Sequence, residues 1–135
     1  MRVLVDTSVW SLALRRKKTA RLNEQERQLQ DALLEAIQNG LVAMIGPIRQ
    51  ELLSGIKDPT QFAQVRLALE PYRDEELEAA DYEEAARLYN LCRSKEMECG
   101  PVDMLICAVA IRRKWRVLAN DASLNKGLEI VASQP

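Results

Sequence analysis

Short apolar runs, separated by longer stretches of helical spacing, set the pattern of hydrophobic and polar positions along the chain. Residues 2–5 (RVLV) and 41–45 (LVAMI) are rich in branched apolar side chains and too short for helices, so they predict buried strands. Residues 115–119 (WRVLA) predict another strand, and residues 128–131 (LEIV) predict a last one at the edge of the sheet. The chain is therefore expected to build its core around a small sheet.

The stretches between these strands carry apolar residues at the spacing of amphipathic helices. Asn23 and Glu26 have capping-box spacing at the start of one stretch, and Asp81 and Glu84 repeat it at the start of another. Helices are predicted over about residues 9–14, 23–39, 47–54, 58–70, 81–97 and 102–111. The last of these, VDMLICAVAI, is apolar almost all round, which predicts a buried helix.

The alternation of strands with one or more helices is typical of a parallel sheet with crossover helices on both faces. The length of 135 residues suits one domain, which we expect to span residues 1–135. No apolar run approaches the length needed to cross a bilayer, and no signal peptide precedes the first strand. We therefore expect a cytoplasmic α/β protein with no membrane partner.

Composition narrows the chemistry that this chain can perform. The chain contains no histidine, which excludes Ser-His-Asp and Cys-His catalysis and the usual zinc sites. Cys92, Cys99 and Cys107 lack the spacing of a metal-binding pair, so we expect small buried residues in a reducing compartment. Carboxylates and hard cations remain as the chemical equipment.

Two basic clusters contrast with a net charge of −1, which gives no overall attraction to nucleic acid. The first cluster follows the first predicted helix and consists of Arg15, Arg16, Lys17, Lys18 and Arg21. This cluster either attracts nucleic acid locally or is a solvated helix end. The second cluster consists of Arg112, Arg113, Lys114 and Arg116. We expect it to be a solvated helix end that complements the helix dipole.

Four acids lie at the ends of the predicted elements. Asp6 follows the first strand and Asp121 the third, and the sequence RVLVDTS around the former is echoed by RVLANDAS around the latter. Glu51 and Asp103 lie in helices that follow or flank these strands. Asp6 and Asp103 could simply cap helices, and Glu51 could be a surface residue. Together, oxygen ligands at the carboxyl ends of parallel strands predict a Mg²⁺ or Mn²⁺ site for phosphoryl chemistry.

The motifs DTSVW after the first strand, QELLSG, PVDMLICAVA and RVLAND resemble the four acidic motifs of PIN domains. They are most similar to those of the small VapC-type toxins of bacterial and archaeal toxin-antitoxin pairs, in order, spacing and total length. The resemblance implies a three-layer α/β/α sandwich with a central, mostly parallel sheet. It also implies a Mg²⁺-dependent endoribonuclease, with Mn²⁺ as an alternative ion, that acts on RNA, binds a cognate antitoxin and forms a homodimer.

The resemblance assigns a role to each candidate residue. Asp6 and Asp103 would bind the metal directly, and Glu51 would bind it or orient the attacking water. Asp121 would bind the metal directly or through water. Ser8 would position a carboxylate or a phosphate oxygen.

The fourth motif departs from the family pattern. Ala119, Ser123 and Leu124 stand where family members commonly carry Thr, Asp and Phe, which leaves open whether one or two metal ions bind. The alternative function is therefore a catalytically weak or inactive PIN-like module that binds RNA or protein. A phosphatase or phosphoacceptor domain with Asp6 as nucleophile is disfavoured, because Ser8 stands in place of the second aspartate of a DxD pattern.

Overall fold

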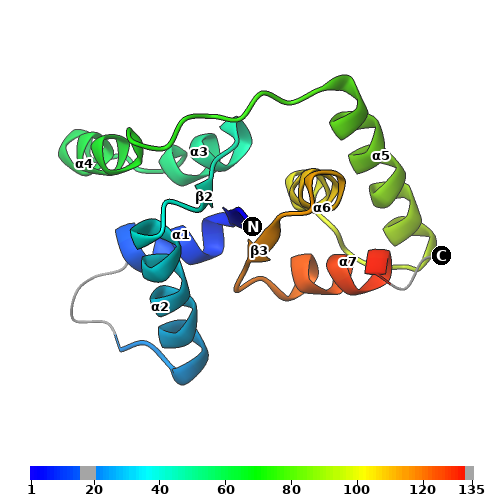
Figure 1. The fold of residues 1–135 in the computed structure, drawn as a ribbon, viewed down its shortest axis with the longest axis horizontal. Helices are drawn as coiled ribbons and strands as arrows, with labels where there is room; N and C mark the ends of the chain where they lie inside the picture. The colour runs from blue at the N-terminus through cyan, green and yellow to red at the C-terminus, as the bar shows by residue number, and fades with distance from the viewer. Residues whose placement is uncertain (16–20, 133–135) are drawn as a thin grey trace.

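Three short parallel strands form the sheet at the centre of the molecule (Figure 1). The computed structural model describes residues 1–15 and 21–132. The strands are β1 (Val3–Val5), β2 (Val42–Ala43) and β3 (Arg116–Leu118), in the order β2-β1-β3. Val3 of β1 pairs with Val42 on one side and with Arg116 on the other. The predicted parallel sheet is confirmed, with the first strand of the chain at its centre.

Seven helices occur within these described ranges, and they cover both faces of the sheet. They are α1 (Thr7–Leu14), α2 (Glu24–Gln38), α3 (Gly46–Leu53), α4 (Pro59–Leu69), α5 (Ala79–Ser94), α6 (Pro101–Arg113) and α7 (Ala122–Ala132). Because β1 lies between β2 and β3, right-handed crossovers place the two connections on opposite faces. Figure 1 shows α2 and α6 on either side of the strands. The three-layer α/β/α architecture is the predicted one.

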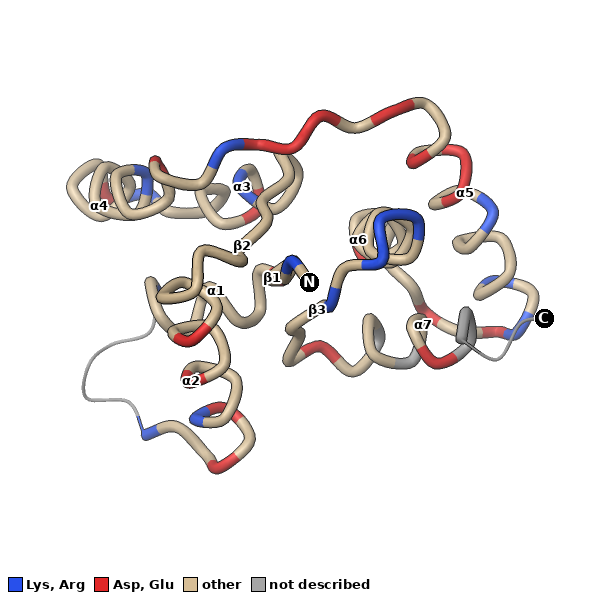
Figure 2. Tube along the Cα trace, viewed as in Figure 1, with Lys and Arg blue, Asp and Glu red and all other residues tan. Residues whose placement is uncertain are grey.

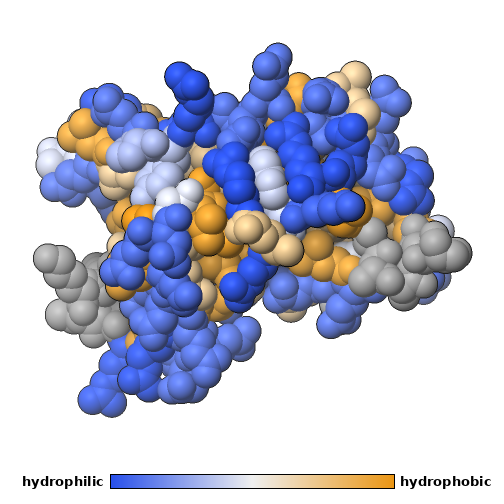
Figure 3. Space-filling model, viewed as in Figure 1, coloured by the Kyte–Doolittle hydropathy of each residue, from blue (hydrophilic) through white to orange (hydrophobic). Residues whose placement is uncertain are grey.

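The core forms between the sheet and the helices. Leu4 and Val5 of β1 are fully buried, and α6 is buried continuously from Met104 to Ala110. This burial explains why the sequence of α6 is apolar almost all round, as a helix inside a core must be. The face seen in the space-filling view is mainly hydrophilic, with hydrophobic patches between the hydrophilic side chains (Figure 3).

The cysteines and the lengths of the helices are two further features for which the sequence set an expectation. Cys92, Cys99 and Cys107 are buried free thiols, as predicted. None of the described helices is both long and apolar enough to cross a membrane.

The capping box predicted for α2 is confirmed. The Glu26 N–H donates a hydrogen bond of 2.8 Å to Asn23 Oδ1, and the Asn23 N–H donates one of 3.0 Å to Glu26 Oε1. These two bonds satisfy N–H groups that have no partner inside the helix. The helix therefore begins where its local sequence signal indicates.

The expectation of a terminal strand at residues 128–131 is wrong, because these residues lie in α7. Asp121 Oδ1 accepts a hydrogen bond of 3.2 Å from the Leu124 N–H, and Leu124 is fully buried. A Cβ atom at Gly127 would lie 2.8 Å from Met104 Cε, so the glycine lets α7 pack closely on α6. A short apolar run does not distinguish a strand from a buried helix. Here the cap and the packing against α6 select the helix.

α5 begins one turn earlier than the capping-box prediction for Asp81 and Glu84. Its first residue is Ala79, and Asp81 lies inside the first turn. Asp81 Oδ2 accepts a hydrogen bond of 2.8 Å from the Glu78 N–H. Asp81 is fully buried. The polar residues that surround it in the chain gave no sign of this burial.

The second basic cluster is only in part the solvated helix end that was predicted. Lys114 and Arg116 are exposed. Arg112 Nη1, however, lies 2.5 Å from Asp81 Oδ1, and Arg113 Nη2 lies 2.9 Å from Asp81 Oδ2. Figure 2 shows these basic residues at the end of α6 and the acidic residues along the segment that leads into α5. The end of α6 therefore holds the start of α5 through ion pairs to the buried Asp81 carboxylate.

Candidate functional site

Asp6 lies where β1 ends and α1 begins, and it also caps α1. It is 3% exposed, and its Oδ2 accepts hydrogen bonds from the Ser8 N–H at 3.1 Å and from the Ser8 hydroxyl at 2.6 Å. The Ser8 hydroxyl in turn accepts a hydrogen bond of 2.9 Å from the Asn120 N–H, beyond β3. Ser8 therefore holds the Asp6 carboxylate and ties together the ends of two neighbouring strands.

Asp121 lies beyond β3 at the same edge of the sheet. The Asp6 N–H donates a hydrogen bond of 2.9 Å to the Leu118 carbonyl, which joins the end of β1 to the end of β3. Asp121 caps α7 through its 3.2 Å hydrogen bond from the Leu124 N–H. Because neighbouring parallel strands end at one edge, both acids are delivered to the crevice where such sheets bind ligands.

Glu51 lies on α3 with its side chain exposed. The hydroxyl of Thr7 donates a hydrogen bond of 2.7 Å to Glu51 Oε1. Since Thr7 directly follows Asp6, this bond orients the Glu51 carboxyl group beside the end of β1. Thr7 is a residue that sequence reasoning missed, because its only signal was a hydroxyl next to a candidate acid.

Asp103 lies in the first turn of α6 and is half-buried. The pKa of its carboxyl group is raised to about 6, first by burial and then by the negative charges of Asp121, Asp6 and Glu51. A hydrogen bond from the Gly100 backbone opposes this shift of the pKa. A Cβ atom at Gly100 would lie 3.3 Å from Asp103 Oδ2, so the glycine allows the loop to pass close to the carboxylate. The structure therefore brings Asp121, Asp6 and Glu51 within electrostatic reach of Asp103.

The chemistry of this donor set fits a hard divalent cation. Carboxylates supply only oxygen donors, which Mg²⁺ and Mn²⁺ prefer. Two like charges about 4 Å apart repel by up to about 4 kcal/mol at an effective dielectric near 20, and a cation would offset that repulsion. In the described part of the chain, no three acidic or thiol side chains converge tightly enough to hold an ion as they stand. Binding would therefore require the carboxylate side chains to turn toward a common point.

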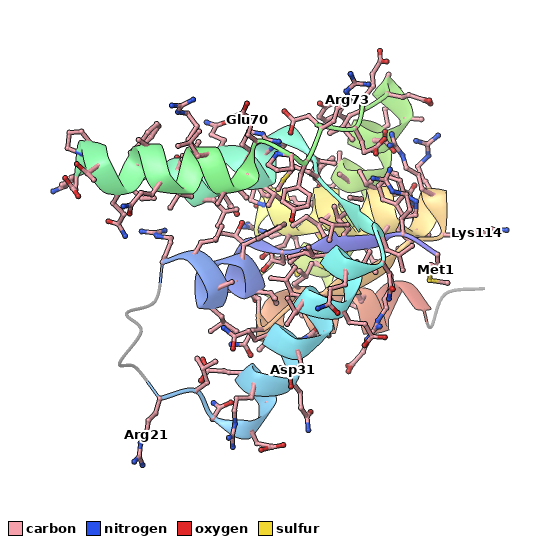
Figure 4. All side chains as sticks on the ribbon, turned by 60° about the vertical axis from the view of Figure 1, so that its left-hand side comes forward. Met1, Arg21, Asp31, Glu70, Arg73 and Lys114 are labelled. Carbon is pink, nitrogen blue, oxygen red and sulfur yellow. The ribbon has the colours of Figure 1, made fainter. Side chains whose placement is uncertain are left out.

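The structure describes only part of the basic run that follows α1. Arg15 is exposed at the C-terminal cap of α1, and Arg16, Lys17 and Lys18 lie outside the described residues. Figure 4 shows the charged side chains of Arg21, Asp31, Glu70 and Arg73 on the outside of the protein, and all four are exposed. Asp6 and Asp103 differ from these residues because they are buried and half-buried, respectively.

Comparisons with known proteins agree with the fold. Residues 3–127 match the family model of the PIN domain, a range that includes Asp6, Glu51, Asp103 and Asp121. A chain in the crystal structure of FitAcB from Neisseria gonorrhoeae has the same fold, with a TM-score of 0.70 and 18% sequence identity. That similarity covers 94% of this chain and 93% of the other. No curated protein sequence matched. Through the match over residues 3–127, this chain belongs to the PIN domain family.

Proposed function

We propose that this protein is a metal-dependent endoribonuclease that acts as the toxin of a toxin-antitoxin pair. PIN domains are generally nucleases. The observation that carries the proposal is the gathering of acids at one sheet edge, where burial, and then the charges of Asp121, Asp6 and Glu51, raise the pKa of Asp103. Such a set is costly without a cation, and a cation activates water without any histidine.

In this proposal each acid has a distinct task. Asp6 and Asp103 hold Mg²⁺ or Mn²⁺, and Asp121 binds it directly or through water. When bound, the ion lowers the pKa of a coordinated water and neutralises charge on the scissile phosphate. Glu51 is exposed and held at Oε1 by Thr7, a placement suited to orient the attacking water or accept its proton at the other oxygen.

Substrate and partner contacts belong to the same proposal. The run at residues 15–18, of which Arg15 is exposed, binds the phosphate backbone of RNA. Ser8 positions the Asp6 carboxylate, to which it donates at 2.6 Å. A cognate antitoxin holds the protein inactive, and the protein forms a homodimer, whose mass light scattering would report.

The test is cleavage of RNA by the purified protein in Mg²⁺, in Mn²⁺ and in excess EDTA. We expect cleavage with either ion and none in EDTA. Asp103→Asn should abolish cleavage in every condition. Asp58→Asn is the matched control, because it also removes one negative charge but lies at the cap of α4, where asparagine caps as well as aspartate. Growth arrest on expression, absent for Asp103→Asn, tests the toxin role.

A binding module with little catalysis is the second candidate function. The observation that favours it is Ala119, which is 7% exposed and offers no hydroxyl beside Asp121, where family members commonly carry threonine. RNA binding without cleavage in any ion would support this alternative and contradict the nuclease proposal.

A further inference from the structure

A cavity of about 610 Å³ opens between the end of α5 and the loop that leads into α6. Tyr89 and Arg93 of α5 line one side, and loop residues 96–100 line the other. This volume lies within the range of about 300–1,000 Å³ that is usual for small-molecule sites, so the cavity is large enough for one nucleobase.

Tyr89 and Arg93 contact each other at this cavity, where Arg93 Nη1 donates a hydrogen bond of 3.5 Å to the Tyr89 hydroxyl. The guanidinium carbon of Arg93 lies 5.9 Å from the centre of the Tyr89 ring. Tyr89 is half-buried and packs against the core, whereas Arg93 is exposed. Among the described residues Arg93 has no carboxylate partner within ion-pair distance. An aromatic ring held against the core, beside a guanidinium group that no carboxylate neutralises, is a surface on which proteins stack unpaired RNA bases.

The loop side of the cavity indicates which part of a nucleotide fits. Glu96 and Glu98 line it, and both are exposed. Ionised carboxylates only accept hydrogen bonds, so they repel a phosphate but can accept from the ring and amino N–H groups of a base. The cavity therefore favours a base over a phosphate.

The cavity also lies next to the candidate metal centre. Its wall includes Cys99 and Gly100, and a Cβ atom at Gly100 would lie 3.3 Å from Asp103 Oδ2. The pKa of the Cys99 thiol is raised to about 11, first by burial, then by Cys92 and last by the negative charge of Asp103. A base in the cavity would therefore place its own phosphates near the acids.

We propose that the cavity at Tyr89 and Arg93 is a nucleobase-binding subsite, which holds one unpaired base of single-stranded RNA beside the acids of the candidate metal centre. The subsite rests on the proposed function for its substrate class. Beyond that function, the subsite assigns Tyr89 and Arg93 the role of holding the base next to the bond to be cleaved.

The test is binding of a short fluorescent single-stranded RNA in EDTA, where the proposed cleavage is off. Tyr89→Leu keeps an apolar side chain against the core but removes the ring, and we expect affinity to fall by about fivefold to a hundredfold, the effect of losing base stacking. Tyr89→Phe keeps the ring and should bind like wild type. Arg93→Gln should bind more weakly than Arg87→Gln, a matched control on α5 that does not line the cavity.

Each outcome separates the subsite from the nuclease proposal. If wild type cleaves RNA in Mg²⁺ but Tyr89→Leu binds as tightly as Tyr89→Phe, the subsite is wrong and the nuclease proposal stands. If no ion supports cleavage but binding depends on the ring, the subsite stands and the nuclease proposal fails. A third outcome would also overturn the subsite. It is unchanged RNA affinity in Tyr89→Leu, together with a salt dependence of RNA binding (log K against log salt) that is shallower by about 0.7 in Arg93→Gln. That result would mean that the cavity binds a phosphate.

Discussion

The hydroxyl of Thr7 donates a hydrogen bond of 2.7 Å to Oε1 of Glu51, which lies 44 positions later in the chain. Thr7→Val removes this donor at nearly constant shape. We expect the affinity for Mn²⁺, measured by titration calorimetry, to fall by about tenfold, because residues that orient metal ligands typically contribute 10- to 100-fold. Thr7→Ser keeps a hydroxyl and should restore the affinity. Equal Mn²⁺ affinity in Thr7→Val and wild type would mean that the bond does not position Glu51 for the ion.

The acids are expected to act as a unit, because the charges of Asp121, Asp6 and Glu51 all act on Asp103. Asp6→Asn and Asp103→Asn should each remove nearly all RNA cleavage, and the double variant should lose little more. The measurement is kcat/KM on a short RNA, with melting curves to show that each variant folds. If the double variant loses activity as the product of two modest single losses, the two acids do not share one site.

The raised pKa of Asp103 predicts how stability depends on pH in EDTA. The unfolded carboxyl titrates near pH 4 and the folded one near pH 6, so between these values the native state binds more protons than the unfolded state. The free energy of unfolding should therefore fall as pH rises from about 4 to about 6, by clearly less than the full value of about 3 kcal/mol, because solvent screens this half-exposed carboxyl group. Asp103→Asn should lack this fall. An equally steep fall in Asp103→Asn would assign it to other groups.

Metal should reverse this loss of stability. Mg²⁺ or Mn²⁺ binds the folded site and should raise the wild-type melting temperature at pH 7 by mass action. Asp103→Asn should melt as high as wild type or higher in EDTA, and it should gain much less from added metal. If wild type is indifferent to millimolar ions and Asp103→Asn is destabilised in EDTA, Asp103 is a structural cap and no metal centre exists here.

Features with local signals were predictable from the sequence. The short run before Asp6 and its echo before Asp121 predicted two strands and the acids that follow them. Parallel order then predicted that both acids reach one edge of the sheet, because neighbouring parallel strands end together. The capping box at Asn23 and Glu26 and the apolar sequence of α6 were equally local signals.

Features that depend on distant residues were not predictable. The hydrogen bond between Thr7 and Glu51 joins two helices, and neither local sequence indicates the other. The run at residues 128–131 is ambiguous by itself, and packing of α7 against Met104 decides its conformation. Arg112 has the local pattern of a helix-end cation, yet its partner is Asp81, 31 positions away.

The network around Asp81 is expected to contribute strongly to stability. Burial by itself raises the pKa of Asp81. Hydrogen bonds from the Glu78 backbone and from Arg112 lower it, and so do the charge and the hydrogen bond of Arg113. The result is a pKa below the usual value for an aspartate. Replacing both arginines with glutamine leaves a buried carboxylate without a cation. We expect the free energy of unfolding at pH 7 to fall by about 3–5 kcal/mol, measured by urea denaturation. Arg66→Gln, an exposed change on α4, is the control and should have little effect.

The sign of the pH dependence distinguishes this network from a general loss of packing. In wild type the folded pKa of Asp81 lies below the unfolded one, so its contribution is present above about pH 4 and is lost as pH falls through the folded pKa. Without Arg112 and Arg113, burial raises the folded pKa, and the Asp81 contribution should then increase as pH falls. Adding Asp81→Asn to the double glutamine variant should recover part of the stability at pH 7, because a neutral amide costs less to bury than an unpaired carboxylate. If Asp81→Asn destabilises that variant further, the arginines do not act by compensating the Asp81 charge.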